Sequence, residues 1–261
     1  MKETKVKILI LNYNGAKILK ECLDSVSEIN YSNYSIVLID NNSIDNSIEF
    51  VKSSYSDVEV VQTGENRLYA GGYNYFFNRD SNSCYYMILN NDTIVDKDIL
   101  NQFIIGVNKY GQEHIYGARI MFARNKSKIW YAGSKVNLSK GIIRHLNIRQ
   151  DIDSLDLKDS ETDYITGCCM FVHSSIVSKM NGFDESFKMY MEDVDFCLRA
   201  RAKGIKSYFL NSPILYHHVS SSVTNKSLKI ISSYIKLSIR YTGIFCLFNV
   251  PLFILRKIFS K

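Results

Sequence analysis

Apolar and polar positions alternate regularly over the first hundred residues. Short apolar runs rich in β-branched side chains predict four buried strands, at residues 6–11, 35–39, 58–62 and 85–89. The amphipathic stretches between them predict helices, at residues 16–26, 43–53 and 71–79. Strands that alternate with helices in this way predict an α/β fold, with a mostly parallel central sheet, helices on both faces and right-handed crossovers.

The pattern loosens in the middle of the chain, from about residue 117 to residue 163. Short strand-like runs are separated there by polar connections, and residues 150–161 contain few apolar side chains. We interpret this part as a variable loop region.

Regular patterning returns with the apolar run at residues 164–173, which predicts a strand. A helix is predicted over residues 193–203, with Gly204 at its C-terminal cap. Residues 207–210 predict a further strand, which leads to the paired histidines at 217–218.

The chain changes character after Asn225. Residues 230–240 predict a helix, and residues 241–259 are strongly apolar, with Pro251 as an interruption. The apolar run at 243–255 is shorter than the roughly 20 residues that span a bilayer. Cations beside an apolar face favour an interfacial helix on an anionic membrane surface. The alternative is a helical pair packed on the domain, and the sequence leaves both open.

Composition agrees with one large domain, or one domain plus a tail, since the chain has 261 residues. The hydrophobic fraction of 46% and the charged fraction of 22% are typical of globular proteins. We predict a domain over 1–225, with halves at 1–100 and 101–225, and a tail over 226–261. The net charge of +6 suits an anionic partner without identifying it. Part of it comes from seven cations in the tail, which has no acidic residue: Lys226, Lys229, Lys236, Arg240, Arg256, Lys257 and Lys261.

The six cysteines form no C-x-x-C pair and no His/Cys cluster at zinc-site spacing. The amino terminus has no signal-peptide cleavage site, so we predict a cytoplasmic protein with reduced thiols. Neither G-x-G-x-x-G nor G-x-x-x-x-G-K-[ST] occurs, which disfavours a Rossmann dehydrogenase and a P-loop NTPase.

Polar clusters follow three of the predicted strands, at residues 12–15, 40–43 and 90–93. Open α/β sheets bind ligands at the carboxyl ends of their strands, so we expect these clusters to converge on one crevice. A carboxylate such as Asp40 at the end of a buried strand is costly unless it makes hydrogen bonds. It could accept one from the N3–H of a pyrimidine, in a pocket shaped by Asn12 and Asn14. The alternative is an Asx turn or helix cap at 40–43.

Asp92 is the leading candidate for a metal ligand. Hard cations prefer oxygen ligands and bridge phosphates with only one or two protein carboxylates. The alternative is that Asp92 caps a helix predicted over residues 96–107. One histidine of the pair at 217–218 is a candidate for a metal or diphosphate contact, although paired histidines are more often structural.

Three carboxylates, Glu192, Asp193 and Asp195, lie at a predicted helix start. Acidic residues are ordinary in a first helical turn because they complement the helix dipole, which accounts for at least one of them. A general base must stay ionised, and a helix N-terminus assists by lowering the carboxylate pKa. We expect Asp193 to be the base, with Glu192 and Asp195 orienting it or binding an acceptor.

Seven segments in order resemble family 2 glycosyltransferases with the GT-A fold, in particular the rhamnosyltransferase-like subgroup, over about four-fifths of the chain. The segments are ILNYNG (10–15), VLIDNNSIDNS (37–47), ENRLYAGGYN (65–74), LNNDT (89–93), TGCCMF (166–171), GFDESFKMYMEDVDFCLR (182–199) and YHHVSSS (216–222). They resemble in turn the opening strand and loop, the uracil-contacting segment, the donor-side loop and helix, the D-x-D element, the acceptor-side strand, the E-D catalytic motif and the terminal His-containing loop.

The resemblance implies a Rossmann-like nucleotide-binding half, an acceptor half, and an inverting reaction in which Asp193 deprotonates the acceptor hydroxyl. It implies Mg²⁺ or Mn²⁺ on Asp92 and His217, with His218 as the alternate ligand. One departure weakens the metal expectation, because Asn90 occupies the first position of the D-x-D element. The implied donor and nucleotide contacts are Asn12, Asn14, Asp40, Asn42, Asn66, Gly71, Asn74 and Asn91. The implied acceptor-side residues are Gly167, Cys168, Glu192 and Asp195.

The implied partners are a UDP- or dTDP-linked sugar, rhamnose by subgroup, and a growing cell-surface glycan or lipid-linked oligosaccharide; no nucleic acid is implied. The implied place is the cytoplasm, with the tail at the inner membrane face as the peripheral option. Two other interpretations stay open. The first is a nucleotide-sugar-binding scaffold that has lost turnover, and Asn90 favours it. The second is a nucleotidyltransferase, although the Gly-rich basic opening loop that is usual for that class is missing.

Overall fold

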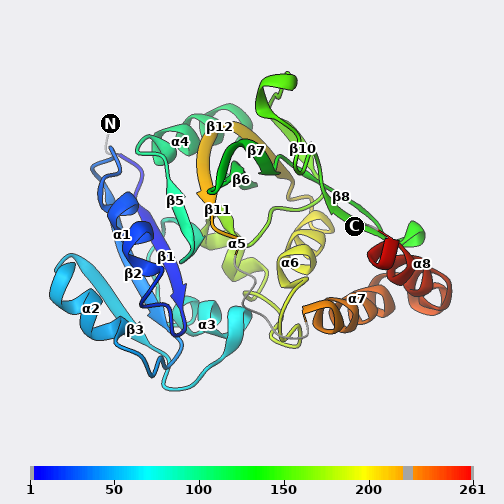
Figure 1. The fold of residues 1–261 in the computed structure, drawn as a ribbon, viewed down its shortest axis with the longest axis horizontal. Helices are drawn as coiled ribbons and strands as arrows, with labels where there is room; N and C mark the ends of the chain where they lie inside the picture. The colour runs from blue at the N-terminus through cyan, green and yellow to red at the C-terminus, as the bar shows by residue number, and fades with distance from the viewer. Residues whose placement is uncertain (1–2, 220–225, 260–261) are drawn as a thin grey trace.

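A computed structural model describes residues 3–219 and 226–259, and its centre is one sheet of 10 strands (Figure 1). The strand order is β10-β12-β6-β11-β4-β1-β2-β3, with β5 on β12 and β7 on β6. The strands are β1 (Val6–Asn12), β2 (Tyr34–Asp40), β3 (Val58–Gln62), β4 (Tyr85–Asn90), β5 (Thr93–Val95), β6 (Ile115–Phe122), β7 (Asn125–Tyr131), β10 (Ser160–Thr162), β11 (Cys169–His173) and β12 (Ser207–His217). A second sheet pairs β8 (Ser134–Asn137) with β9 (Ile142–His145).

Helices cover both faces of the large sheet. One core packs α1 (Leu19–Ser27), α2 (Ser47–Ser54) and α4 (Ile99–Tyr110) on one face. The other core packs α3 (Leu68–Phe77), α5 (Ser174–Lys179) and α6 (Glu192–Arg201) on the opposite face. This confirms the predicted architecture of a sheet between two helical layers.

The first four strands agree with the prediction to within one residue at each end, and β3, β2, β1 and β4 are mutually parallel. The apolar runs of β1, β2 and β4 are almost entirely buried, which is typical of central parallel strands, whereas β3 at the sheet edge is only partly buried. The predicted helix at 16–26 begins only at Leu19, because the amides of Ile18 and Leu19 both donate to the Gly15 carbonyl in a tight turn.

The interpretation of residues 117–163 as a variable loop region is wrong. This part contributes β6 and β7 to the large sheet, together with the β8–β9 pair and β10. Ile129 and Tyr131 on β7 are fully buried. The apolar signal is weak there because the strands are short and most of β7 is polar.

Two further predictions needed correction on this side of the sheet. Residues 164–168 form an irregular segment that ends in a turn at 167–168, and the strand predicted from residue 164 begins at Cys169. Strand β12 continues past the predicted end at 210 to His217, with an irregularity between Phe209 and Ile214 where the register on β6 shifts. Gly204 lies just beyond α6 in the left-handed conformation, with φ +79°.

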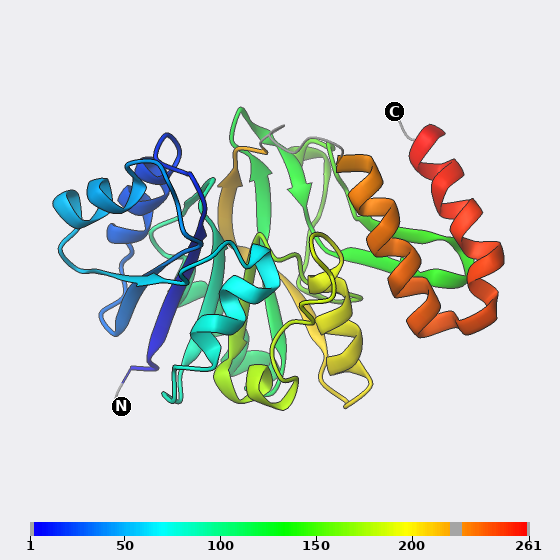
Figure 2. The ribbon, with the colours of Figure 1, turned by 90° about the horizontal axis from the view of Figure 1, so that it is seen from below.

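The end of the chain folds into a helical hairpin, α7 (Lys226–Thr242), η3 (Gly243–Phe245) and α8 (Cys246–Phe259). The rings of Tyr234 and Phe253 stack between the helices, and Ser238 Oγ donates to Asn249 Oδ1. By length and composition alone, the segment Ser227–Lys257 would reach across a membrane, but here η3 breaks it into two antiparallel helices. Figures 1 and 2 show the hairpin at one end of the long axis and α2 at the other.

Candidate functional site

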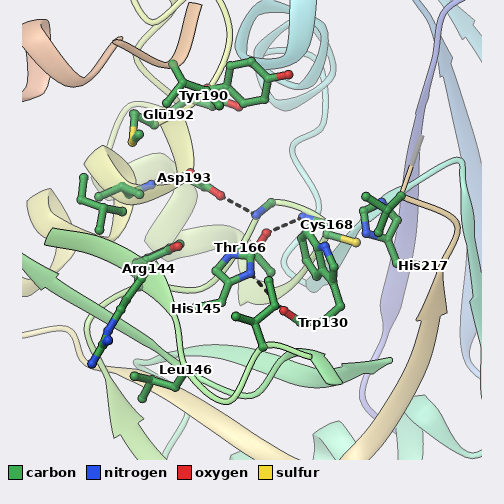
Figure 3. Close-up of a pocket in the computed structure, with 18 of the residues that line it drawn as sticks. Trp130, Arg144, His145, Leu146, Thr166, Cys168, Tyr190, Glu192, Asp193 and His217 are labelled. Carbon is green, nitrogen blue, oxygen red and sulfur yellow. Dashed lines mark hydrogen bonds between the residues drawn. The ribbon is translucent and has the colours of Figure 1, made fainter. Parts of the chain in front are cut away.

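A cavity of about 1290 Å³ opens at the edge of the sheet where β4 and β12 end and β11 begins. Its walls come from the loop after β4, the irregular segment at 164–168, the start of α6, the loop around β9 and the C-terminal hairpin. Figure 3 shows the Asp193 carboxylate directed at the loop that carries Thr166 and Cys168, with His217 beyond Cys168. The predicted site residues on this cavity are Asp92, Gly167, Cys168, Glu192, Asp193 and His217.

Asp92 and His217 face each other across the end of β12. Nε2 of His217 lies 3.1 Å from Oδ1 of Asp92, yet that oxygen and His217 Nδ1 are buried without an aligned hydrogen bond. Burial acts to raise the pKa of the Asp92 carboxyl, but contact with His217 outweighs it, so the pKa lies below its ordinary value.

This pair fits a small divalent cation. Two ligands about 2.1 Å from one ion and at right angles lie roughly 3 Å apart, close to the observed separation. Orphaned buried polar atoms are rare in folded proteins, so the unpartnered Oδ1 of Asp92 indicates a missing partner on this side of the pair. Within the described ranges 3–219 and 226–259, no group of three or more His, Cys, Asp or Glu forms a complete protein cage. A cation here would need further ligands from a substrate or water.

His218, the alternate metal ligand, points elsewhere. Its Nε2 lies 2.7 Å from Glu21 Oε2 on α1, and it is absent from the cavity wall. The geometry therefore favours His217.

The donor-side polar residues near β1 bond mainly to one another. Asp40 is fully buried and accepts hydrogen bonds from Asn12 Nδ2 (3.0 Å), Ser43 Oγ (2.6 Å) and the Ser43 amide (2.9 Å). Asn91 Nδ2 in turn donates to Asn12 Oδ1 at 3.0 Å. Asp40 therefore makes the Asx-turn contact given as its alternative, and it lies outside the cavity wall. A chain of two amides links it to the Asp92 loop.

Gly15 is required by this chain of amides. A Cβ atom there would lie 2.1 Å from Asn12 Oδ1 and 2.6 Å from Asn91 Nδ2. The two amide side chains occupy the space that any larger residue would need.

The other predicted donor residues shape loops. Asn14 and Asn42 adopt left-handed backbone conformations, with φ +52° and +64°, which asparagine tolerates well. Asn66 Oδ1 accepts from the Leu68 amide at the start of α3. Asn74 is buried and exchanges hydrogen bonds with the backbone of Phe183. None of them lines the large cavity.

Gly71 lies on the helix beside the segment that Asn74 holds. A Cβ there would lie 2.9 Å from Arg67 Cβ and 3.3 Å from Glu185 Oε2. The glycine lets the 183–185 segment approach α3 closely, and it too lies outside the cavity wall.

Asp193 lies in the first turn of α6, and two backbone amides hold its carboxylate. Its Oδ2 accepts from Gly167 N at 2.9 Å and its Oδ1 from Val194 N at 2.8 Å. Gly167 is fixed in turn by Tyr69, whose hydroxyl donates to the Gly167 carbonyl at 2.7 Å. A Cβ on Gly167 would lie 2.3 Å from that hydroxyl, so only glycine fits.

The expected lowering of the Asp193 pKa is wrong. Burial raises the pKa of this carboxyl, and the amides of Gly167 and Val194 oppose the rise without cancelling it. Glu192 is more extreme, because burial and the charge of Asp193 raise its pKa to about 8. Its Oε2 is buried without a hydrogen-bond partner. Neighbouring carboxyls with raised pKa values are typical of acid–base sites.

Asp195, predicted on the acceptor side, turns away from the cavity. It is fully buried and bonds to Arg199 Nε at 2.7 Å, Arg240 at 2.6 Å and the Tyr241 hydroxyl at 2.9 Å. Arg240 also contacts Asp184. Asp195 therefore ties the catalytic-side helix α6 to α7 of the hairpin.

Several cavity residues escaped the sequence analysis. Trp130 packs edge-on against His217, with ring centroids 4.5 Å apart at 81°, and it falls in the misjudged loop region. Arg144 and Arg149 come from the same region and add positive charge to the wall of the cavity. No motif marks them, because their place depends on how β7 and β9 fold back.

The arrangement combines a candidate cation site and a candidate carboxylate base in one cavity of about 1290 Å³. Such a site can stabilise a departing anion while it removes a proton from a hydroxyl group.

Comparisons with known proteins agree with this chemistry. Residues 7–179 match the profile of "Glycosyl transferase family 2". The low-salt glycan biosynthesis hexosyltransferase Agl10 of Haloferax volcanii is 24% identical over 211 residues, 77% of this chain and 62% of the relative. The rhamnosyltransferase WbbL of Escherichia coli (strain K12) is 24% identical over 243 residues, 86% of this chain and 88% of the relative.

Among solved structures, GalNAc-T7 with UDP, GalNAc and Mn²⁺ superposes with a TM-score of 0.71 at 14% identity, over 91% of this chain and 48% of that one. The chain thus spans about three-fifths of Agl10 and about half of GalNAc-T7. The fold is the GT-A fold, and the resemblance found in the motifs is confirmed. The chain belongs to family 2 of the glycosyltransferases.

Proposed function

We propose that this protein is an inverting glycosyltransferase that moves a sugar from a UDP- or dTDP-linked donor, with rhamnose as the favoured sugar. The acceptor is a hydroxyl of a growing cell-surface glycan or lipid-linked oligosaccharide, and the reaction takes place in the cytoplasm. The observation that carries the proposal is that Asp92, with its orphaned oxygen, and Asp193, with its raised pKa, line one cavity.

In this proposal Asp193 is the general base. The amides of Gly167 and Val194 fix both carboxylate oxygens, so the side chain cannot rotate away from an incoming hydroxyl. A raised pKa makes the ionised carboxylate a stronger base. One base and one displacement invert the anomeric centre.

Asp92 and His217 would hold Mg²⁺ or Mn²⁺, assisted by the diphosphate of the donor. The ion would supply Lewis-acid stabilisation of the negative charge on the leaving nucleoside diphosphate. Asn90, also on the cavity wall, offers an amide oxygen where the family motif has a carboxylate.

We assign the donor nucleotide to the half formed by residues 1–100 and the acceptor to residues 101–225. The Asp40–Asn12–Asn91 chain lies beside the cavity at the carboxyl ends of parallel strands, where nucleotides bind in open α/β sheets. The tail over 226–261 is treated below as a contact with the cytoplasmic membrane face.

The test is a panel of UDP-, dTDP- and GDP-sugars incubated with the full chain, Mn²⁺ and a saccharide acceptor. We expect release of nucleoside diphosphate with one preferred donor, and NMR of the product should show an inverted anomeric configuration. Release of pyrophosphate would identify a nucleotidyltransferase instead. Binding of a donor without any release would identify the scaffold that Asn90 favours.

A further inference from the structure

The C-terminal hairpin carries an exposed apolar surface that the site does not explain. Six apolar side chains at its tip and along α8 are 42–74% exposed: Ile244, Phe245, Leu247, Phe248, Leu252 and Leu255. Single exposed apolar residues are ordinary, but a contiguous group of this size marks an interaction surface.

The hairpin is nevertheless a folded part of the protein. Tyr234 and Leu237 on α7 are fully buried, and Phe253 on α8 is 2% exposed. On α7 the buried residues fall on the opposite side of the helix from exposed Ile235 and Ile239. The hairpin therefore has an inner face used for packing and an outer face that stays exposed among residues 3–219 and 226–259.

Charge identifies the partner of the outer face. Residues 226–261 contain seven lysines and arginines and no acidic residue. Arg240 is paired with Asp184 and Asp195. Three other cations of this segment are exposed to solvent: Lys229, Arg256 and Lys257. Apolar side chains beside exposed cations suit the headgroup region of an anionic lipid bilayer. A second copy of the chain would bring the same excess of positive charge against itself, which opposes a symmetric contact.

The hairpin also forms part of the cavity. Ile230, Phe253 and Arg256 lie on the same cavity wall as Asp193. Arg240 ties α7 to Asp195 on α6, two residues after Asp193. The hairpin that carries the exposed surface is therefore bonded directly to α6, the helix that carries the candidate base.

We propose that the outer face of the hairpin docks on an anionic lipid bilayer, with Phe245 and Phe248 inserted among the headgroups. The docked hairpin presents the cavity to a lipid-linked saccharide at the bilayer surface. The docking stands on its own observations, and only the presentation of an acceptor rests on the proposed function.

Crossing of the bilayer is disfavoured by the same structure. A spanning helix over 227–257 would separate Tyr234 from Phe253 and pull Arg240 away from Asp195. It would also place Lys236 and Arg240 in the hydrocarbon, where cations are costly.

The experiment is co-sedimentation of the full chain with vesicles, without donor or metal. One set is phosphatidylcholine alone and the other contains phosphatidylglycerol in addition. We expect the protein to sediment with the anionic vesicles and to be released by high salt or alkaline carbonate. The Phe245→Ser/Phe248→Ser double variant should bind more weakly by roughly tenfold for each phenylalanine removed.

Ile105→Ser on α4 is the matched control, because Ile105 is also an exposed apolar residue, at 57%, but lies far from the hairpin in sequence. It should sediment like the unaltered protein, and all three proteins should have the same melting temperature. Equal binding by the double variant, or no binding by the unaltered protein, overturns the proposal.

Two more outcomes also overturn it. Resistance to carbonate means that the segment spans the bilayer, and a dimer in solution that the double variant dissociates means that a second copy covers the face. Because no turnover is measured, these results are independent of nucleoside diphosphate release. A docked protein that is inactive with every donor would refute the proposed function and leave docking intact.

Discussion

The two sides of the site treat their buried polar groups in opposite ways. On the proposed donor side, Asp40 and its partner Asn12 are buried, and both oxygens of the carboxylate have donors. Around the cavity, Asp92 Oδ1, Glu192 Oε2 and His217 Nδ1 are buried without partners. In the part of the chain that the structure describes, only Arg119 Nε joins them in that condition.

This difference separates scaffold from chemistry. A saturated network fixes the backbone and makes each member costly to remove. An unsatisfied buried group costs free energy in the unliganded protein, and it is stabilised when a substrate, cation or proton binds to it. The donor-side network should therefore be read out in stability, and the cavity groups in activity, binding and pH dependence.

The largest expected effect is that of Asp193→Asn, which removes the proposed base and keeps the shape of the side chain. General base catalysis contributes about 10²- to 10⁴-fold, so kcat should fall by that factor. Asp156→Asn is the control, since the Asp156 side chain is 82% exposed. If Asp193→Asn kept its nucleoside diphosphate release, another group would have to be the base.

The next effect separates the two histidines. His217→Ala should weaken Mn²⁺ binding by about tenfold or more, because it removes half of the pair with Asp92. His218→Ala is the matched control, because that ring contacts Glu21 outside the cavity. Calorimetric titration with Mn²⁺ and a donor diphosphate measures both. Equal losses in the two variants would rule out the assignment of His217.

The same contrast explains which parts of this site could be predicted from the sequence. Strands β1 to β4 are long apolar runs with sharp polar ends, so their limits, and the placement of Asp92 at a strand end, follow from local pattern alone. The E-D motif located Asp193 at a helix start in the same way.

What local pattern could not supply depends on residues distant in the chain. The raised pKa of Asp193 comes from burial, and residues close to it in the sequence do not predict that burial. Asp195 is engaged by Arg240, 45 residues later. Trp130 reaches His217 only because β7 folds back on β6. In each case tertiary contacts decide the chemistry.

A third prediction tests the saturated side. Asp40→Asn replaces one acceptor oxygen with an NH₂ group. In one orientation of the amide this donor faces the Ser43 backbone amide, and in the other it faces Asn12 Nδ2 and Ser43 Oγ. An unmatched buried donor costs about 1–3 kcal/mol, so the free energy of unfolding in urea should fall by that amount. Asp57→Asn at an exposed position should change it by less than about 0.5 kcal/mol. An unchanged free energy of unfolding for Asp40→Asn would remove the contrast between the two sides.

The smallest effect concerns the charge on Glu192. The ionised base would be the active form, and burial raises the pKa of Asp193, so kcat/KM should fall on the acidic side of its pH profile. Glu192 is the group that titrates near pH 8, because burial and the charge of Asp193 raise its pKa to about 8. Glu192→Gln removes this titration, so any change of kcat/KM near pH 8 should disappear while the acidic limb of the profile stays in place. Glu113→Gln, at an exposed position, should leave the profile in place.

The same substitution has a stability counterpart with a definite sign. A carboxyl whose pKa is higher in the folded protein binds more protons there than when unfolded, so its contribution to stability is lost as pH rises from about 4.5 to about 8. Glu192→Gln should therefore stabilise the protein above pH 8 relative to the unaltered chain. If neither the pH profile nor the stability changed, Glu192 would not carry a raised pKa in the folded protein.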